Sequence, residues 1–176
     1  MADTRKTVLI TGCNPGGIGN SLARGFHAHN LRVLATARQR EKIDDLASLG
    51  IETFSLEVTD ESSIANLLDE VRAATNGRLD YLVNNAGRNY TVPALDVDFD
   101  EVRATFEVNV FAVMRMCKVF APLLIQAKGT VVQIGSLAGV MPYVRLALHR
   151  AVLWCAVPAA LYHLMLCPAV PCSAVS

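Results

Sequence analysis

The 176-residue sequence lacks several features that mark particular classes of protein. Neither charge is in excess, because 16 Lys and Arg balance 16 Asp and Glu, so the strongly basic surface of a nucleic-acid-binding domain is not expected. Its five cysteines form no Cys-x-x-Cys pair and no zinc pattern with the four histidines. We therefore expect reduced thiols, a cytoplasmic location and no metal site. The first residues show no apolar signal region with a cleavage site, so secretion is not expected.

The C-terminal part of the sequence lacks charge altogether. Ala151–Ser176 contains no Asp, Glu, Lys or Arg, and 20 of its 26 residues are apolar. The composition changes after about residue 142, which predicts a globular domain over 1–142 and an atypical apolar tail over 143–176. One hypothesis is that the tail is translated non-coding or frame-shifted sequence. The alternatives are that its 17 uncharged residues 151–167 attach the chain to a membrane, or that they form a buried helix.

Short apolar runs alternate with helical periodicity through residues 1–142. The pattern predicts strands at 6–11, 31–36, 51–58, 80–84 and 130–134, and helices at 18–30, 41–49, 61–76 and 101–120, the last ending before Pro122. Asp60 is expected to cap the third helix. Alternating strands and helices predict an α/β fold with a doubly wound parallel sheet, the Rossmann type, whose ligands bind outside the carboxyl ends of the strands.

Glycines cluster between the first strand and the first helix, in the segment Thr11–Gly19. At this position in a β-α-β unit, glycines permit a tight turn, close approach of backbone N–H groups to a pyrophosphate, and close packing of helix on strand. The alternative is a plain glycine turn. The segment 36–40 contains no carboxylate that would hold a ribose 2′-hydroxyl, whereas Arg38 could bind a 2′-phosphate. NADP(H) is therefore favoured over NAD(H), unless Arg38 is only a solvated loop charge.

Four motifs in order resemble the short-chain dehydrogenase/reductase family. They are Thr11–Gly19, Asn84-Asn85-Ala86-Gly87, Asn109 within Val108-Asn109-Val110, and Ile134–Gly139 around Ser136. The glycine loop is one residue longer than is usual in the family, so either Gly16 or Gly17 could take the middle role. In this respect it resembles the acyl-dihydroxyacetone-phosphate reductase branch.

The resemblance implies roles for individual residues. Ser136 would bind the substrate carbonyl and Asn109 would support a proton-relay water, although an Asn so near an apolar helical seam also needs a partner. The implied NADP(H)-binding residues are Gly12, Gly16, Gly17, Ile18, Gly19, Arg38, Glu57, Asn85, Ala86 and Gly87. The implied activity is hydride transfer between NADP(H) and a small ketone, aldehyde or alcohol, in a homodimer whose contacts involve Glu101–Phe120.

The resemblance fails at the family's Tyr-x-x-x-Lys, expected about 13 residues after Ser136. His149 stands there, and no lysine follows Lys128. The chain is also too short for the family's sixth and seventh strands, so the sheet is expected to be truncated after about five. The sequence thus leaves three interpretations: an NADP(H)-dependent reductase, a catalytically inactive dinucleotide-binding remnant, or a membrane-attached fragment.

Overall fold

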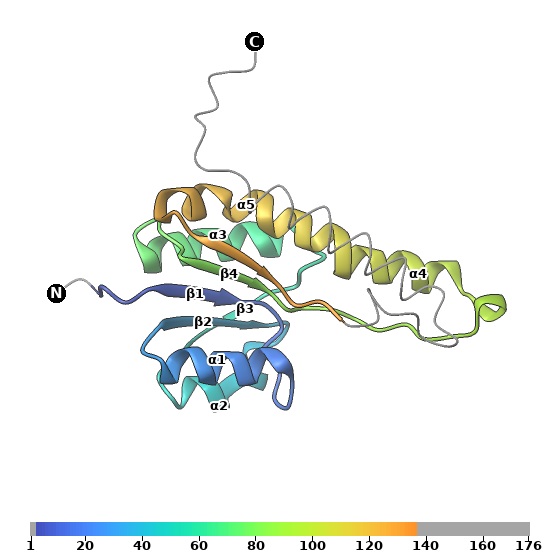
Figure 1. Cartoon of the computed structure of the whole chain (residues 1–176), viewed down its shortest axis with the longest axis horizontal. Helices are drawn as coiled ribbons and strands as arrows, with labels where there is room; N and C mark the ends of the chain where they lie inside the picture. The colour runs from blue at the N-terminus through green and yellow to red at the C-terminus, as the bar shows by residue number, and fades with distance from the viewer. Residues whose placement is uncertain (1–2, 137–176) are drawn as a thin grey trace, which may run out of the picture.

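The computed structural model describes residues 3–136 and forms one parallel sheet (Figure 1). Its strands are β1 (Thr7–Ile10), β2 (Arg32–Ala37), β3 (Glu52–Ser55), β4 (Tyr81–Asn84) and β5 (Thr130–Gln133). They lie in the order β3-β2-β1-β4-β5, and every pair is parallel. This order confirms the predicted doubly wound α/β fold, because the chain runs outward from β1 in both directions. The predicted tail 143–176 lies outside the described residues.

Helices cover both faces of this sheet. The helices α1 (Ile18–Ala28) and α2 (Asp44–Ala47) lie on one face, and α3 (Glu61–Thr75) and α5 (Ala112–Ala127) lie on the other (Figure 1). Before α5, the chain forms α4 (Phe99–Phe106) and the π-helical segment η3 (Glu107–Phe111), and the two shorter 3₁₀ turns are η1 (Arg40–Ile43) and η2 (Ala94–Asp96). The three segments from α4 to α5 make one long helix that extends beyond the sheet (Figure 1).

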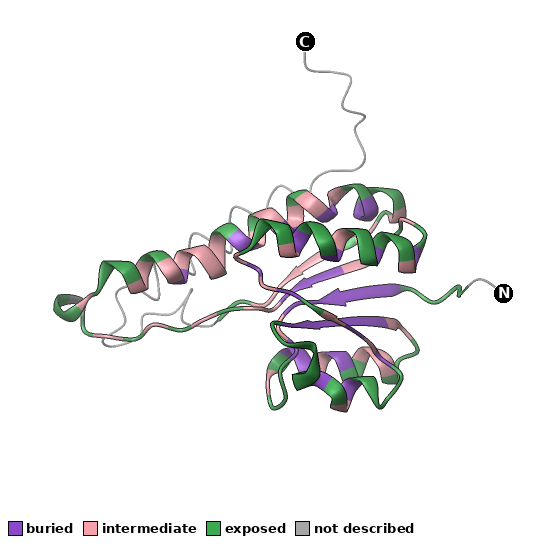
Figure 2. Cartoon of the chain, turned by 180° about the vertical axis from the view of Figure 1, so that it is seen from behind, coloured by how far each residue is buried: buried purple, intermediate pink, exposed green. Residues whose placement is uncertain are grey.

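The strand residues alternate between two cores, as the period of two in a strand requires. Leu9, Leu34 and Leu82 belong to the core on the side of α3 and α5. Met116 and Phe120 of α5 belong to the same core. Their neighbours along the strands, such as Val8, Val33 and Val83, belong to the second core on the α1 side. The two central strands β1 and β2 are therefore buried on both faces (Figure 2).

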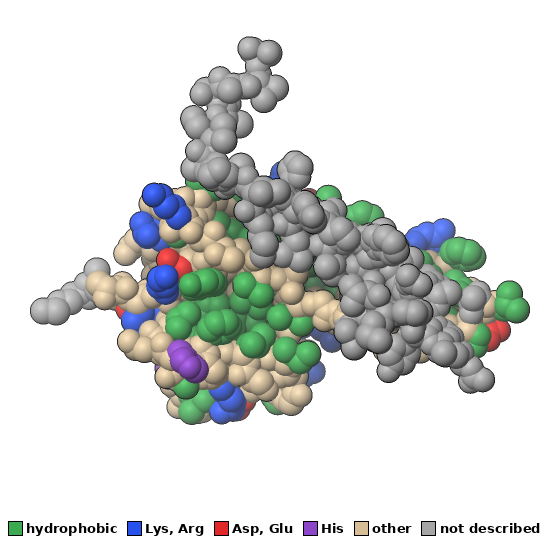
Figure 3. Space-filling view, in the orientation of Figure 1, with side chains coloured by type: hydrophobic (Ala, Val, Ile, Leu, Met, Phe, Trp, Pro, Cys, Tyr) green, Lys and Arg blue, Asp and Glu red, His purple; other side chains and the backbone are tan. Residues whose placement is uncertain are grey.

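The second core is not fully covered within residues 3–136. Tyr81 of β4 and Val132 of β5 are only partly buried there, as is Ile134 just after β5. They adjoin the partly buried Leu22 and Phe26 of α1. Figure 3 shows hydrophobic side chains gathered on the side of the molecule between α1 and α5. The α1 side of β4 and β5 thus carries an apolar surface.

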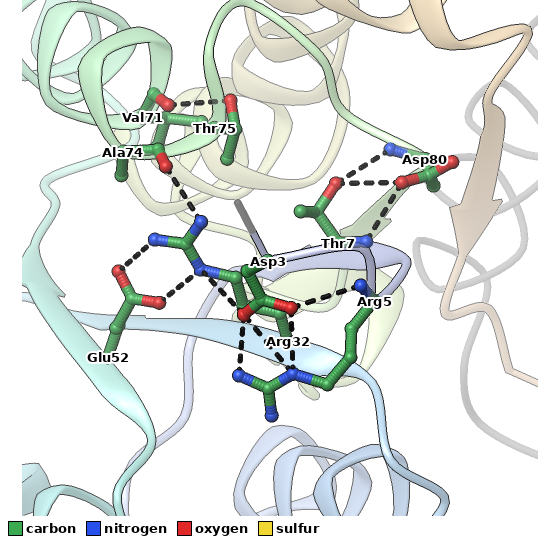
Figure 4. A network of polar contacts seen from close by, with 9 residues as sticks. All are labelled: Asp3, Arg5, Thr7, Arg32, Glu52, Val71, Ala74, Thr75 and Asp80. Atoms are coloured by element: carbon green, nitrogen blue, oxygen red, sulfur yellow. Dashed lines mark hydrogen bonds and ion pairs between the residues drawn. The ribbon is translucent and has the colours of Figure 1, made fainter. Parts of the chain in front are cut away.

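Polar contacts fasten the amino ends of the strands, opposite to the ends where ligands bind in such folds (Figure 4). Arg32, the first residue of β2, donates to Glu52 of β3 at 2.6 Å and to the carbonyl of Ala74 at the end of α3 at 2.7 Å. Thr7 of β1 and Asp80 before β4 exchange hydrogen bonds of 2.9–3.0 Å. These contacts tie the first four strands and α3 together.

Helix boundaries differ from the sequence-based expectation at two places. The predicted helix 41–49 is a 3₁₀ turn followed by the four-residue α2. The predicted stop before Pro122 is wrong, because α5 continues through the proline to Ala127. Proline removes one helical hydrogen bond, but the buried Phe120, Leu123 and Leu124 hold both sides of it against the core. The predicted cap is confirmed, since the Asp60 carboxylate accepts the N–H of Ser62 at 2.9 Å.

Within residues 3–136, the long helix Phe99–Ala127 has the length and composition that could cross a membrane. Its Met116, Phe120 and Leu123 are core residues packed against the sheet. A helix of this kind is also what the interior of a domain produces, because a central helix buries a wide apolar face. The 17 uncharged residues 151–167, on which membrane attachment was hypothesised, lie outside the described part of the chain.

Two methionines on α5 test this packing. Met116 is 1% exposed and Met114 is 61% exposed. We expect Met116→Ala to lower the free energy of unfolding by about 2–5 kcal/mol, because it removes buried surface and leaves a cavity. Met114→Ala should change the free energy of unfolding by less than about 0.5 kcal/mol. Urea denaturation measures both variants, and equal effects would contradict the assignment of the buried face.

Candidate functional site

A cleft of about 760 Å³ opens at the carboxyl ends of β1, β2 and β4. Five segments form its wall: the glycine loop with the start of α1, the end of β2, the loop after β3, the loop after β4, and the junction of α4 with η3. The lining residues are Gly12, Asn14, Gly17, Ile18, Ala37, Arg38, Leu56, Glu57, Val58, Thr59, Asn85, Ala86, Gly87, Arg88, Ala104, Glu107 and Val108. Its volume lies in the range of small-molecule sites, about 300–1,000 Å³.

The glycine loop begins its turn at Asn14. The N–H of Gly17 donates to the Asn14 carbonyl at 3.1 Å, which closes a four-residue turn with Pro15 and Gly16 at its centre. Gly16 has φ +75°, the left-handed value that position i+2 of a type II turn requires. Gly17 follows as the N-cap of α1 and lines the cleft. Of the two glycines between which the middle role was left open, Gly16 makes the turn and Gly17 lines the cleft.

Close packing joins the glycine loop to the loop after β4. The Nδ2 of Asn85 donates to the carbonyls of Thr11 at 2.7 Å and Gly12 at 2.9 Å. A Cβ on Gly19 would lie 2.5 Å from this Nδ2 and 2.6 Å from the Gly12 carbonyl oxygen. A Cβ on Gly12 would lie 2.9 Å from the Cα of Ala86. Only glycine fits at these two positions.

Thr11 contributes to the same junction. Its hydroxyl oxygen accepts the N–H groups of Asn85 and Ala86, both at 2.9 Å. Sequence reasoning treated Thr11 as the end of a strand and assigned it no role. The signal available was its position directly before the glycines, where a buried hydroxyl can satisfy backbone groups that no strand pairs. Asn85, Ala86 and Gly87 all line the cleft, so Thr11 fixes the loop that carries them.

Two charged residues among those predicted to bind the cofactor, Arg38 and Glu57, line the cleft at the ends of β2 and β3. Arg38, just after β2, is exposed and makes no ion pair or hydrogen bond within residues 3–136, so its guanidinium is available to an anion. Glu57 lines the cleft as well, but its carboxylate accepts the hydroxyl of Thr59 at 2.9 Å and the N–H of Thr59 at 3.2 Å. Glu57 is therefore turned toward its own loop.

Asn109 has the partner that its place near an apolar seam requires. Its Oδ1 accepts the N–H of Arg88, and its Nδ2 donates to the Arg88 carbonyl, both at 2.9 Å. Asn109 lies in the π-helical segment η3, whose single turns occur frequently at functional sites. Sequence reasoning missed Arg88, which lines the cleft and forms an ion pair with Glu101.

The remaining predicted residues are distributed as follows. Ile18 lines the cleft at the first turn of α1. Ser136 is exposed, three residues beyond β5 at the same carboxyl edge of the sheet, and is not among the lining residues. Within residues 3–136, no group of three or more His, Cys, Asp or Glu side chains could hold a metal ion. All of the predicted cofactor residues except Gly16 and Gly19 thus line one cleft. Gly16 makes the turn of the loop, and Gly19 packs against Asn85 and the Gly12 carbonyl.

Burial raises the pKa of two cysteine thiols near the site, Cys13 and Cys117. It raises the pKa of Cys13, in the glycine loop, to about 12. It also raises the pKa of Cys117, whose sulfur accepts weak hydrogen bonds from the amides of Asn84 and Gln133. Both side chains are therefore neutral thiols at neutral pH.

Comparison with known proteins identifies the class. A family model described as short chain dehydrogenase matches residues 6–152. The chain belongs to this family of Rossmann-fold oxidoreductases.

Particular relatives extend the comparison. The chain is 48% identical over 149 residues to the NADPH-dependent 1-acyldihydroxyacetone phosphate reductase of Schizosaccharomyces pombe, covering 85% of this chain and 50% of that protein. It is 44% identical over 151 residues to the short-chain dehydrogenase virD of Hypocrea virens, covering 86% and 53%. The chain thus spans about half the length of the curated relatives it matches.

Solved structures agree with the family. A short-chain dehydrogenase from Streptomyces avermitilis superposes with a TM-score of 0.80 at 32% identity, covering 89% of this chain and 58% of that one. A metagenomic short-chain oxidoreductase in complex with NADP superposes with a TM-score of 0.75 at 33% identity, covering 86% and 71%.

Substitutions at two glycines of α1 would test the close packing of the glycine loop against the loop after β4. We expect Gly19→Ala to lower the free energy of unfolding by about 1–3 kcal/mol, because its Cβ would collide with Asn85 and the Gly12 carbonyl. Gly25→Ala is the matched control. Nothing lies within 4 Å of a Cβ there, so it should stabilise the protein by about 0.5–1 kcal/mol. Urea denaturation measures both, and a harmless Gly19→Ala would disprove the close approach.

The buried thiol gives a chemical prediction. Because the thiolate is the reactive form and Cys13 is buried with its pKa raised to about 12, iodoacetamide at pH 8 should leave Cys13 unmodified in the folded protein. Peptide mass spectrometry before and after addition of urea measures the modification. Equal labelling of Cys13 in both conditions would show that the glycine loop is not packed as described.

Proposed function

We propose that the chain binds NADP(H) in the cleft, with the diphosphate at the glycine loop and the 2′-phosphate at Arg38. The observation that carries the proposal is the position of Arg38, a cation without a partner within residues 3–136 on the wall facing the N-terminus of α1. A helix N-terminus with unpaired N–H groups favours phosphate. An arginine guanidinium can grip a second phosphate with paired donors.

The rest of the cleft suits a dinucleotide. The segment Leu56–Thr59 supplies an apolar and polar edge beyond Arg38, and Asn85–Gly87 forms the opposite wall. Glu57 keeps its carboxylate on Thr59, which moves negative charge away from an incoming phosphate. The name of the S. pombe relative and the NADP complex of the metagenomic neighbour support the choice of NADP over NAD.

We further propose an NADP(H)-dependent reductase that acts on a small ketone or aldehyde. The cofactor supplies the hydride, Ser136 would donate a hydrogen bond to the substrate carbonyl, and Asn109 holds the Arg88 backbone at the cleft wall.

A specific observation supports the alternative of binding without catalysis: the sequence contains no Tyr-x-x-x-Lys after Ser136. Loss of a general acid costs about 10²- to 10⁴-fold in rate. A turnover assay with a panel of carbonyl compounds separates the two.

The long helix suggests how copies of the chain could associate. Phe99, Phe111, Met114 and Ile125 are exposed hydrophobic residues along α4–α5. A homodimer through this helix, as the resemblance implies, remains part of the proposal, and sedimentation tests it. A cytoplasmic location likewise stays a prediction.

Arg38 gives the direct test of the cofactor preference. We expect Arg38→Ala to weaken NADPH binding about 10- to 100-fold, because it removes charge-assisted hydrogen bonds to the 2′-phosphate. Binding of NADH should not change. Arg40→Ala is the matched control, since Arg40 lies outside the cleft wall and donates to the hydroxyl of Thr53.

Fluorescence titration of the reduced nucleotides measures all three proteins. Equal loss of NADPH and NADH binding in Arg38→Ala would contradict the 2′-phosphate assignment. Wild-type protein that is folded and binds neither nucleotide would refute the proposed function.

A further inference from the structure

A polar network with one buried member, Asn20, lies beside the glycine loop and includes no residue that lines the cleft. Asn20, in the first turn of α1, is 6% exposed. Its Nδ2 donates to the Cys13 carbonyl at 3.2 Å and to Oδ2 of Asp45 in α2 at 3.0 Å. Arg24, one turn further along α1, donates to Oδ1 of Asn20 at 3.0 Å and to Oδ2 of Asp45 at 2.6 Å. The three side chains thus hold one another and the loop.

We propose that Asn20, held by Asp45 and Arg24, is a positioning residue that aims the N–H of Asn14 into the cleft as a donor for the cofactor diphosphate. The proposal rests on the proposed function and adds to it a residue that does not touch the cleft.

The argument starts from the geometry of one peptide group. All peptide bonds in residues 3–136 are trans, and in a planar trans peptide the C=O and the following N–H point in opposite directions. Asn20 draws the Cys13 carbonyl down between α1 and α2. The N–H of Asn14 must therefore point the other way, on the side where Asn14 lines the cleft.

Neighbouring bonds fix this orientation. The N–H of Cys13 donates to the Thr36 carbonyl at 2.8 Å, so the peptide groups on both sides of Cys13 are held. Within residues 3–136, the N–H of Asn14 has no acceptor. An unpaired N–H in a cleft is costly in the free protein unless solvent or a ligand satisfies it. An anion at this position would provide the acceptor.

The network also explains why position 20 carries an amide. Both the Cys13 carbonyl and the Asp45 carboxylate are acceptors, so the group between them must be a double donor, and the Nδ2 of Asn supplies two hydrogens. The hydrogen bond from Asn20, followed by that from Arg24, holds the pKa of Asp45 below its ordinary value. Asp45 is therefore ionised at neutral pH and remains an acceptor for Asn20.

The test uses two ligands that differ in one group. NADPH contains the diphosphate, whereas adenosine 2′-monophosphate contains only the part that Arg38 would bind. Asn20→Asp keeps the shape of the side chain but removes both donors. We expect it to weaken NADPH binding about tenfold or more, while binding of adenosine 2′-monophosphate changes less than about twofold. Asp45→Asn should cause a smaller loss in the same direction, and Asp44→Asn, on the exposed side of α2, should cause none.

Hydrogen exchange of the ligand-free protein gives an independent measurement. The N–H of Cys13 donates to the Thr36 carbonyl of β2, and the N–H of Gly17 donates to the Asn14 carbonyl within the glycine loop. They should exchange at least about tenfold faster in Asn20→Asp, whereas the amides of α3 should not change. This comparison also shows whether the variant is folded.

The outcomes separate the two proposals. Equal loss of both ligands, or unchanged NADPH binding together with unchanged exchange at Cys13 and Gly17, would overturn the role of Asn20. If exchange accelerates in the variant but wild-type protein binds no nucleotide, the proposed function fails, and the role of Asn20 toward a diphosphate fails with it while its hold on the loop is upheld.

Discussion

The close approach of two loops is the constraint on which the site depends. The side chain of Asn85 bonds to the carbonyls of Thr11 and Gly12, in a space that a side chain on Gly19 would fill. This contact sets how near the end of β4 lies to the start of α1, and hence the width of the cleft between them. Thr11 strengthens the junction from the other side by accepting two N–H groups. The shape of the proposed cofactor site and the packing of the central strands are thus consequences of one arrangement.

The two ends of the sheet differ in the polar contacts that they make. At the amino ends, charged pairs such as Arg32 with Glu52 join neighbouring elements. At the carboxyl ends, glycines replace side chains, and backbone groups such as the N–H of Asn14 stay unpaired within residues 3–136. The unpaired donors that a ligand can use therefore lie at the carboxyl ends of the strands.

The sequence predicted the features that depend on local patterns. The parallel, doubly wound sheet followed from alternating elements, the Asp60 cap from residue type, and the loop position from clustered glycines. Features that depend on distant contacts were missed. The hold of the core on both sides of Pro122 overrides the proline, and the pairing of Asn109 with the Arg88 backbone joins segments that no motif connects. Thr11 and Asn20 showed their roles only when their partners were in place.

The described residues separate binding from chemistry in a physically consistent way. The groups proposed to hold the cofactor come from the loops after β1, β2, β3 and β4 and from the start of α1. The strands and helices that carry these loops pack into the cores around Leu9 and Val8. The groups proposed to act on substrate come later, starting with Ser136 at the edge of the described structure. A phosphate-binding loop gains its precision from neighbours that are already present in this half of the fold. Nucleotide affinity should therefore depend little on the sequence after β5, whereas turnover of a carbonyl substrate would also require a general acid.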